Sequence, residues 1–409
     1  MKKSLKFFGI AAVAALALLA TSCEKKDTAK NYTLTVNFSL PDGVSSVSGL
    51  TVEATKGSKT TTLTVEETEN GYTAVATLSQ GNYSISVSGT ASVSSRVIGT
   101  ADVSLYEDVE TSITLSVVIE SPLLIKAFQY SPGALYYVNG SDTWIEIVNN
   151  SDETQYLDQL IIVGGMGGQK AANAWQANGL EHLYGGASQS PVFAFPGKGT
   201  DYPLEPGKSV VLANNPKNHK VKDDGGEIVP DPDHENCADL SNADWEFYCD
   251  YNANDVDYEG IPNLECIFYS YKYQANWGQN FFCNAAMLIK LPEGVTPSQY
   301  VANEDNLMTT PGTTSDTQFL VFPNEYVLDA VDIWDADEEV HYPTFLAIDD
   351  AQGILGTGAW EGNAVRRKVA KIENGRAYYK DTNNSSKDFV SAKGGTIVPA
   401  AVPTAADAE

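Results

Sequence analysis

An alternating segment near the start of the chain reads YTLTVNFSL, at residues 32–40. Its apolar residues occupy every second position from Tyr32 to Leu40, with Thr, Asn and Ser between them. Because successive side chains of a β-strand point to opposite faces, this period of two predicts a strand with one buried and one solvated face. Pro41-Asp42-Gly43 follows as a turn signal.

The same pattern recurs through the first third of the chain, with short alternating segments, frequent turns and almost no helical periodicity. This pattern predicts an all-β sandwich over residues 31–119. The segment LSQGNYSI, at residues 78–85, resembles part of transthyretin-like and carboxypeptidase-regulatory-like sandwiches. That resemblance implies a spacer or stabilising module. Further strands are expected at residues 50–52, 63–65, 72–78, 83–87, 103–105 and 113–117.

The length of the chain favours more than one domain, and its charge argues against a nucleic-acid-binding protein. The chain has 409 residues and a formal net charge of −27. Such a length favours more than one domain. The negative charge argues against binding of nucleic acid, which requires clusters of Lys and Arg. Aromatic residues make up 10% of the chain, enough to build packed cores rather than a disordered chain.

The N-terminus has the pattern of a secretory signal. Three lysines lie within residues 1–6, an apolar run covers residues 7–20, and Thr21-Ser22-Cys23 follows. The run is shorter than the ~20 residues of a membrane span. The segment resembles a bacterial lipoprotein signal, although Leu19 stands four places before Cys23 rather than three. We expect a signal peptide at 1–22, lipidation of Cys23, a tether at 23–30 and a surface-exposed lipoprotein of the outer membrane.

A second domain is predicted over residues 122–409, after the boundary Glu120-Ser121-Pro122. Its segments resemble, in order, the lamin-tail domain, which is an immunoglobulin-like β-sandwich. Residues 164–203 and 214–285 are then insertions, and loops of that length are usually functional or internally ordered. The resembling segments are WIEIVNNS at 144–151, LEPGKSVVLA at 204–213, LDAVDIW at 328–334 and DTNNSSKDF at 381–389, with further strands expected at 123–128 and 156–161.

A more specific resemblance covers the whole chain. The segments NPKNH at 215–219, DLSNADWE at 239–246 and IPNL at 261–264 are similar to an uncharacterised family of Bacteroidota lipoproteins. That family combines a signal, a small β domain and an elaborated lamin-tail-like domain. The resemblance implies architecture and location, and it assigns no chemistry.

Four cysteines lie close together in the second insertion: Cys237, Cys249, Cys266 and Cys283. An even number in an exported chain favours two disulfides, for which three pairings exist. Pairing of neighbours, Cys237–Cys249 and Cys266–Cys283, is the simplest prediction. Zinc binding is the weaker alternative because the chain has no Cys-x-x-Cys motif.

An acidic stretch at residues 250–259 places oxygen ligands at alternate positions: Asp250, Asn252, Asn254 and Asp257. This spacing suits Ca²⁺, but Asp255 stands where an EF-hand has glycine and the bidentate Glu is missing. A solvated acidic loop is the favoured interpretation, with a calcium site as the alternative, and no other cofactor is predicted.

Aromatic residues among amides and glycines give a second candidate site. Trp175, Tyr184 and Trp277, with Phe281 and Phe282, could stack on sugar rings, although sandwich cores also use such residues. We therefore list Trp175, Tyr184 and Trp277 as ligand-contact candidates.

Enzymatic chemistry has little support in the sequence. None of the four histidines stands in a nucleophile, zinc-protease or Cys-His motif. The expected function is binding or structural, with the loops of the second domain facing a glycan or an outer-membrane partner complex. A cell-envelope hydrolase with a carboxylate pair in those loops is the alternative.

Overall fold

Strands dominate the structure, and its helices are short. The computed structural model describes residues 30–57, 59–69, 71–92, 95–133, 141–166, 169–185, 190–273, 276–278, 284–404 and 407. The prediction of an all-β protein is confirmed. None of the helices in these ranges combines the length and apolar character that crossing a membrane requires. Cys23 and the predicted signal peptide lie outside the described residues.

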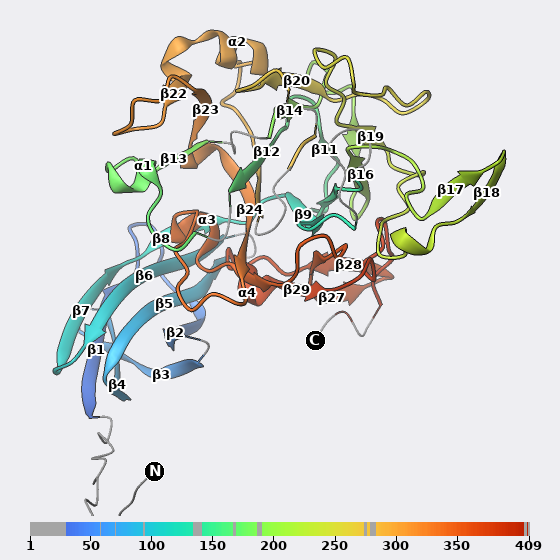
Figure 1. The fold of residues 1–409 in the computed structure, drawn as a ribbon. Helices are drawn as coiled ribbons and strands as arrows, with labels where there is room; N and C mark the ends of the chain where they lie inside the picture. Colours follow the sequence, from blue (N-terminus) through green and yellow to red (C-terminus); the bar gives the residue numbers. More distant parts are fainter. Residues whose placement is uncertain are drawn as a thin grey trace, which may run out of the picture.

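The N-terminal domain, β1 to β8, is one eight-stranded sheet in the order β7-β1-β4-β3-β2-β5-β6-β8 (Figure 1). β1 pairs antiparallel with β4 and parallel with β7. The strands expected from alternation are present, except that the one expected at 113–117 is divided at Leu115 between β7 and β8. The strands are β1 (Asn31–Ser39), β2 (Ser48–Lys56), β3 (Lys59–Thr68), β4 (Gly71–Ser79), β5 (Gly81–Ser92), β6 (Ser95–Leu105), β7 (Val109–Thr114) and β8 (Ser116–Ile119).

This sheet curls around a core of its own. Leu115 alone separates β7 from β8, so the chain itself joins the two edge strands of the sheet. The alternate apolar residues of β1, Leu34, Val36 and Phe38, are buried in that core with residues of β2 to β7. The alternation therefore sets which side chains face inward.

The C-terminal domain contains two six-stranded sheets. The first has the order β19-β16-β10-β9-β26-β29, and the second has the order β20-β14-β12-β21-β24-β25. The first sheet consists of β9 (Leu123–Gln129), β10 (Trp144–Asn149), β16 (Ser209–Ala213), β19 (Trp245–Glu246), β26 (Ala364–Arg367) and β29 (Phe389–Ala392). The second consists of β12 (Ile161–Met166), β14 (Val192–Ala194), β20 (Glu265–Phe268), β21 (Asn284–Ile289), β24 (Val327–Asp335) and β25 (Ile354–Gly356).

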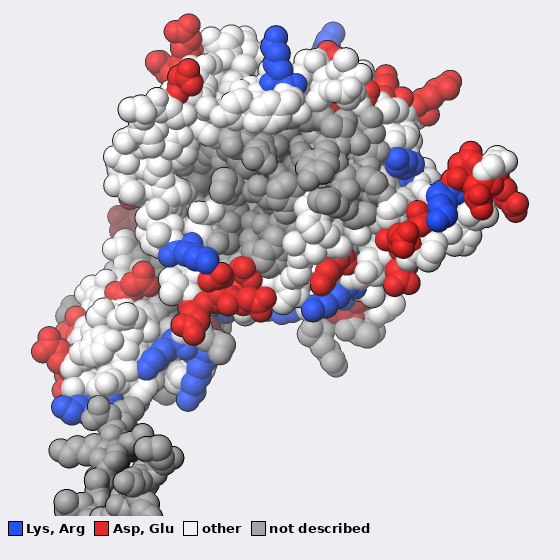
Figure 2. Space-filling view, in the orientation of Figure 1, with Lys and Arg blue, Asp and Glu red and all other residues white. Residues whose placement is uncertain are grey.

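Smaller elements surround these two sheets. The β17–β18 hairpin projects from the domain (Figure 1), and acidic side chains gather over it (Figure 2). The other small strands are β11 (Gln155–Tyr156), β13 (Leu183–Gly185), β15 (Pro203–Leu204), β22 (Leu307–Thr309), β23 (Gln318–Pro323), β27 (Val369–Glu373) and β28 (Arg376–Tyr379), with the hairpin formed by β17 (Val221–Asp224) and β18 (Glu227–Pro230). The helices are α1 (Ala174–Ala177), α2 (Pro297–Ala302), α3 (Ala347–Asp350) and α4 (Ser385–Asp388), and the 3-10 turns are η1 (Pro232–His234), η2 (Glu304–Asn306) and η3 (Asn324–Tyr326).

The two six-stranded sheets share one hydrophobic core. Ile125 and Ile147 of the first sheet pack in the same cluster as Ile162 and Val331 of the second. The outer face of the first sheet is covered as well, so every residue of β9 and β10 is buried. On that outer face Lys126 and Glu146 form an ion pair of 2.6 Å, covered by the C-terminal segment through a bond from Lys126 to the Ala401 carbonyl. This ion pair offsets the cost of burying two charged side chains on a face that the chain covers.

Two expectations about the C-terminal domain need correction. The strand expected at 156–161 is interrupted, because Gln159 adopts a positive φ of 61° and β12 begins only at Ile161. Residues 164–203 and 214–285 are not simply loops outside the sheets. They supply β14, β19 and β20, together with core residues such as Trp245 and Phe247.

A buried guanidinium ties the domain together. Arg367 of β26 is 1% exposed and donates to the Asp329 carboxylate at 2.5 Å and to the Ile125 carbonyl at 2.8 Å. Asp381 and Asp388 lie 3.7 and 3.9 Å from the same guanidinium. One side chain therefore joins strands β9, β24 and β26 to the loop before β29.

That loop also contacts the N-terminal domain. Asn383, at a positive φ of 47°, accepts a hydrogen bond of 3.0 Å from Arg96 of β6, and Lys387 pairs with Glu53 of β2. We expected the segment to close on its own backbone. Asn384 does so by accepting from the Lys387 N–H, whereas Asn383 reaches other segments instead.

Replacing Arg367 with Ala is expected to destabilise the C-terminal domain by about 3–5 kcal/mol, because the buried carboxylates of Asp329 and Asp388 lose the guanidinium that they face. Its neighbour Arg366 is part-exposed and pairs with Asp407, so Arg366→Ala is expected to cost about 1 kcal/mol or less. Urea unfolding followed by tryptophan fluorescence measures both. Equal losses for the two variants would contradict the role given to Arg367.

Candidate functional site

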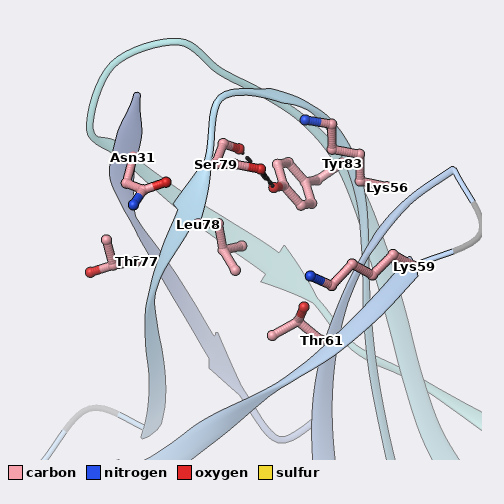
Figure 3. A pocket seen from close by; sticks show the side chains of 8 residues that line it. All are labelled: Asn31, Lys56, Lys59, Thr61, Thr77, Leu78, Ser79 and Tyr83. Atoms are coloured by element: carbon pink, nitrogen blue, oxygen red, sulfur yellow. Dashed lines mark hydrogen bonds between the residues drawn. The ribbon is translucent and has the colours of Figure 1, made fainter. Parts of the chain in front are cut away.

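A cleft lies at one end of the sheet in the N-terminal domain. It has a volume of about 530 Å³ and opens among β1, β2, β3, β4 and β5 (Figure 3). Lys56 lies 5.7 Å from the centre of the Tyr83 ring, and the Tyr83 hydroxyl donates to the Ser79 carbonyl at 2.7 Å. Among the described residues that line it, the charged ones are Lys56 and Lys59. The described lining thus consists of amines, hydroxyls, one amide and one apolar side chain, and the Tyr83 hydroxyl is already bonded to the chain.

Two of the aromatic ligand-contact candidates are core residues. Trp277 is fully buried and stacks on Phe247, with ring centroids 4.8 Å apart. Tyr184 is 4% exposed, and its hydroxyl donates to Asp349 at 2.7 Å. Both rings, which the sequence singled out as ligand contacts, are therefore enclosed by the core in this structure. Phe281 and Phe282 lie outside the described residues.

Trp175 keeps partial exposure on helix α1. Asn173 caps this short helix by accepting from the Gln176 N–H, and Gln176 reaches back to the Asn173 backbone. The cap fixes the direction in which Trp175 leaves the chain. Its ring packs edge-on against Phe319, with centroids 5.3 Å apart.

Tyrosines of the second insertion, residues 214–285, contact the same segment of the chain as Trp175 does. The Tyr271 hydroxyl lies 2.6 Å from the Thr317 hydroxyl, and Tyr271 stacks on Tyr273 at 5.2 Å. Thr317 directly precedes β23, and Phe319 is the second residue of that strand, so extended backbone would direct their side chains to the same face. Tyr271 and Trp175 therefore contact one face of this segment about 7 Å apart along the chain.

We define the aromatic surface as Trp175, Phe319, Tyr271 and Tyr273. Its outermost member, Tyr273, is 69% exposed, which leaves a ring face open to solvent. The sequence reasoning found Trp175 but missed Phe319, which has no sequence signal. The alternation of tyrosine in YSYKY, at residues 269–273, is the signal that would have singled out Tyr271 and Tyr273.

Two of the calcium candidates, Asn252 and Asp257, accept hydrogen bonds from nearby residues of the chain. Asn252 is buried and accepts from the Asn254 N–H at 3.1 Å, while Asp257 accepts from the Asn263 side chain at 3.1 Å. Asp250 is exposed. Within the described ranges, three or more His, Cys, Asp or Glu side chains do not gather in a way that could hold a metal ion. The loop's shape comes from these internal bonds rather than from a convergent set of ligands.

Two carboxyls in this region, those of Glu246 and Asp255, have raised pKa values. Burial raises the pKa of Glu246 to about 8 and that of Asp255 to about 6. Glu246 is fully buried. One of its oxygens accepts from the Tyr258 N–H at 3.0 Å, and the other has no hydrogen-bond partner among the described residues. A carboxyl enclosed in this way does not touch a substrate in this conformation.

The predicted disulfide pairing is not observed. Cys237 and Cys249 are both buried free thiols, so the Cys237–Cys249 bond is absent. Cys237 lies beside Asp142, and burial raises its pKa to about 12. Cys266 is also free, and Cys283 lies outside the described residues. The closeness of Cys237 and Cys249 in sequence was misleading, because the chain between them passes through β19 in the first sheet.

These features define a two-domain all-β protein with an aromatic surface on its second domain. Residues 205–395 match the family model described as "Protein of unknown function (DUF4876)". No curated protein matches the chain.

Two solved structures are similar to this chain. One is a DUF4876 family protein from Bacteroides thetaiotaomicron, with 22% identity, a TM-score of 0.56, and coverage of 88% of this chain and 94% of that chain. This likeness concerns the fold alone, and it agrees with the predicted resemblance to an uncharacterised Bacteroidota family. The other is a DUF3823 family protein from Parabacteroides merdae, with 11% identity, a TM-score of 0.16, and coverage of 34% of this chain and 67% of that chain.

Glu246 predicts a pH dependence of stability. Between the ordinary carboxyl pKa of 4.5 and the folded value of about 8, the folded chain keeps a proton that the unfolded chain releases. The contribution of Glu246 to stability is therefore greatest below pH 4.5 and falls as the pH rises towards 8.

The isosteric variant Glu246→Gln is expected to flatten this decline and to be more stable than the parent at pH 9. Urea unfolding at pH 5, 7 and 9 measures the effect. The exposed Glu265, replaced by Gln, is the matched control and should leave the pH profile unchanged. A parent profile that does not fall between pH 5 and 9 would contradict the assignment.

Proposed function

We propose that this protein is a lipid-anchored lipoprotein of the cell envelope, exposed at the outer membrane, that acts as a binding module. The proposal begins with the signal-like residues 1–22 and Cys23. A tether of seven residues between Cys23 and Asn31 spans at most about 25 Å. The anchor would therefore keep the start of β1 close to the membrane.

The N-terminal domain suits the role of a spacer. Asn31 pairs with Ser79, next to the β5–β6 end at which Gly81 pairs with Leu105. Arg96, which contacts the second domain, lies near the opposite end of β6. Eleven residues of extended strand separate these ends by roughly 35 Å. The second domain would thus stand away from the membrane, as its position at the far end of the sheet in Figure 1 suggests.

For the second domain we propose a lamin-tail-like, immunoglobulin-like sandwich. Its two six-stranded sheets enclose one core. The Asp381–Phe389 segment lies against that core, where Asp381 and Asp388 face the Arg367 guanidinium. Both features are compatible with that class of fold. A sandwich of this kind supports many functions, so the function has to be argued from the surface.

The observation that carries the binding proposal is the aromatic surface. Tyr273 exposes a ring that is backed by Tyr271, and Tyr271 is tied to Thr317. Flat rings held in place bind the apolar faces of sugar rings at low entropic cost. The net charge of −27 disfavours acidic polymers. We therefore propose a neutral glycan as the ligand, recognised alone or as part of an outer-membrane complex.

The hydrolase alternative has less support. The shifted carboxyl Glu246 is enclosed, and its exposed acidic neighbour Asp257 accepts a hydrogen bond from the Asn263 side chain within the same loop region. A glycosidase requires two carboxyls that reach the substrate from opposite sides. We retain binding as the proposed function.

Tyr273→Ala is expected to weaken binding to a neutral polysaccharide by about two- to tenfold, since one aromatic stack contributes about 0.5–1.5 kcal/mol. Affinity electrophoresis in gels containing starch, xylan or mannan measures it. Tyr106, a 57% exposed tyrosine of the N-terminal domain, provides the control as Tyr106→Ala. Retardation by none of the three polysaccharides, or the same loss in both variants, would overturn the proposed ligand class.

Cys23→Ser is expected to release the protein from the membrane fraction, because the acyl chains supply the anchoring free energy, about 0.8 kcal/mol for each buried CH₂. Cell fractionation and immunoblotting measure the partition, and Cys237→Ser serves as the control. If the Cys23 variant remained wholly with membranes, the anchor would have to lie elsewhere.

A further inference from the structure

Two distant segments of the second insertion run side by side in parallel. Glu246 forms a parallel bridge with Asn263. The Glu246 N–H donates to the Pro262 carbonyl at 3.0 Å, and the Leu264 N–H donates to the Glu246 carbonyl at 2.8 Å. These two bonds set the register between the segments.

The same register brings two cysteines together. Three residues beyond the bridge on each segment lie Cys249 and Cys266. Beyond them, Tyr251 stacks on Tyr269 with ring centroids 3.8 Å apart, so the segments are still adjacent there. Neighbouring strands are about 4.8 Å apart, which lies within the 4.4–6.8 Å range of Cα separations in disulfides.

The side chains agree with the backbone register. The Cys249 thiol lies beside the Cys266 thiol, and this contact together with burial raises the pKa of Cys249 far above its ordinary value. Cys249 is fully buried in the main core, whereas Cys266 is partly exposed. The Tyr251 hydroxyl is buried next to both sulfurs and makes no hydrogen bond of ordinary geometry with the described residues.

We propose that Cys249 and Cys266 are the disulfide-forming pair of this protein. Oxidised glutathione, or another small disulfide, would supply the oxidising equivalents. The Cys266 thiolate attacks one sulfur of the small disulfide, forming a mixed disulfide and releasing one thiol. Cys249 then gives up its proton and attacks the Cys266 sulfur, which releases the second thiol. Two protein thiols are oxidised and one small disulfide is reduced to two thiols.

Such a bond would link two segments of the chain next to the aromatic surface. It would close the loop that carries the acidic turn at residues 250–259 and would join that loop to the strand leading to Tyr271 and Tyr273. The pairing rests on register and contact alone, so it does not depend on the glycan proposal.

The test uses the full chain, reduced with dithiothreitol and then incubated in a buffer of oxidised and reduced glutathione. Remaining thiols are alkylated, and non-reduced peptides are mapped by mass spectrometry. The expected product is a Cys249–Cys266 linked peptide, with Cys237 alkylated. Its formation should accelerate as the pH rises from 7 to 9, because the attacking species are thiolates.

Three variants make the result decisive. Cys237→Ser should form the bond as the parent does, while Cys249→Ala and Cys266→Ser should not, with circular dichroism confirming that each is folded. Oxidation should raise the Tm of the parent by about 5–10 °C through closure of the loop and leave the Tm of Cys266→Ser unchanged. A Cys237–Cys249 or Cys266–Cys283 peptide as the main product, or full alkylation of Cys249 and Cys266 in the folded parent, would overturn the proposal.

Discussion

The architecture of the second domain depends on one buried positive charge. Arg367 cannot be removed from water unless acceptors surround it, and the chain supplies Asp329, Asp381, Asp388 and the Ile125 carbonyl. These acceptors come from segments far apart in the sequence, so satisfying the guanidinium fixes how those segments meet. The loop that completes the network then contacts the first domain through Asn383 and Lys387. The orientation of the two domains is therefore coupled to the satisfaction of a charge in the core.

In the region of the candidate site, the segments that complete the core also position the aromatic surface. The segments predicted to be insertions contribute large aromatic side chains, Trp245, Phe247 and Trp277, to the main core. Their burial holds the chain on either side of the tyrosine row, which explains how Tyr271 and Tyr273 are presented from a defined base. Binding surfaces held by a packed core lose less conformational entropy when a ligand binds. In this protein a segment that completes the core also carries the most exposed aromatic ring of the surface.

The candidate site could be predicted only in part, and the particular residues show why. Aromatic composition singled out Trp175, Tyr184 and Trp277 alike, yet only Trp175 keeps exposed area. Composition carries no information about which of several apolar rings a core will use. The acidic stretch at 250–259 was likewise visible, but its side chains satisfy the turn itself. The expected Cys237–Cys249 bond is absent for a related reason, since neighbours in sequence diverge when a strand lies between them.

The sequence by itself determined the all-β class, the strands of the first domain and the principal strands of the second, because alternation and turn residues act over a few neighbouring positions. The net charge, and the resemblance of residues 1–22 to a secretory signal, are likewise properties of the sequence alone. Tertiary structure alone decided the burial of Trp277, the meeting of Trp175 with Phe319, and the approach of Cys249 to Cys266. These depend on register between segments separated by many residues, and register is set by hydrogen bonds and packing that local sequence does not specify.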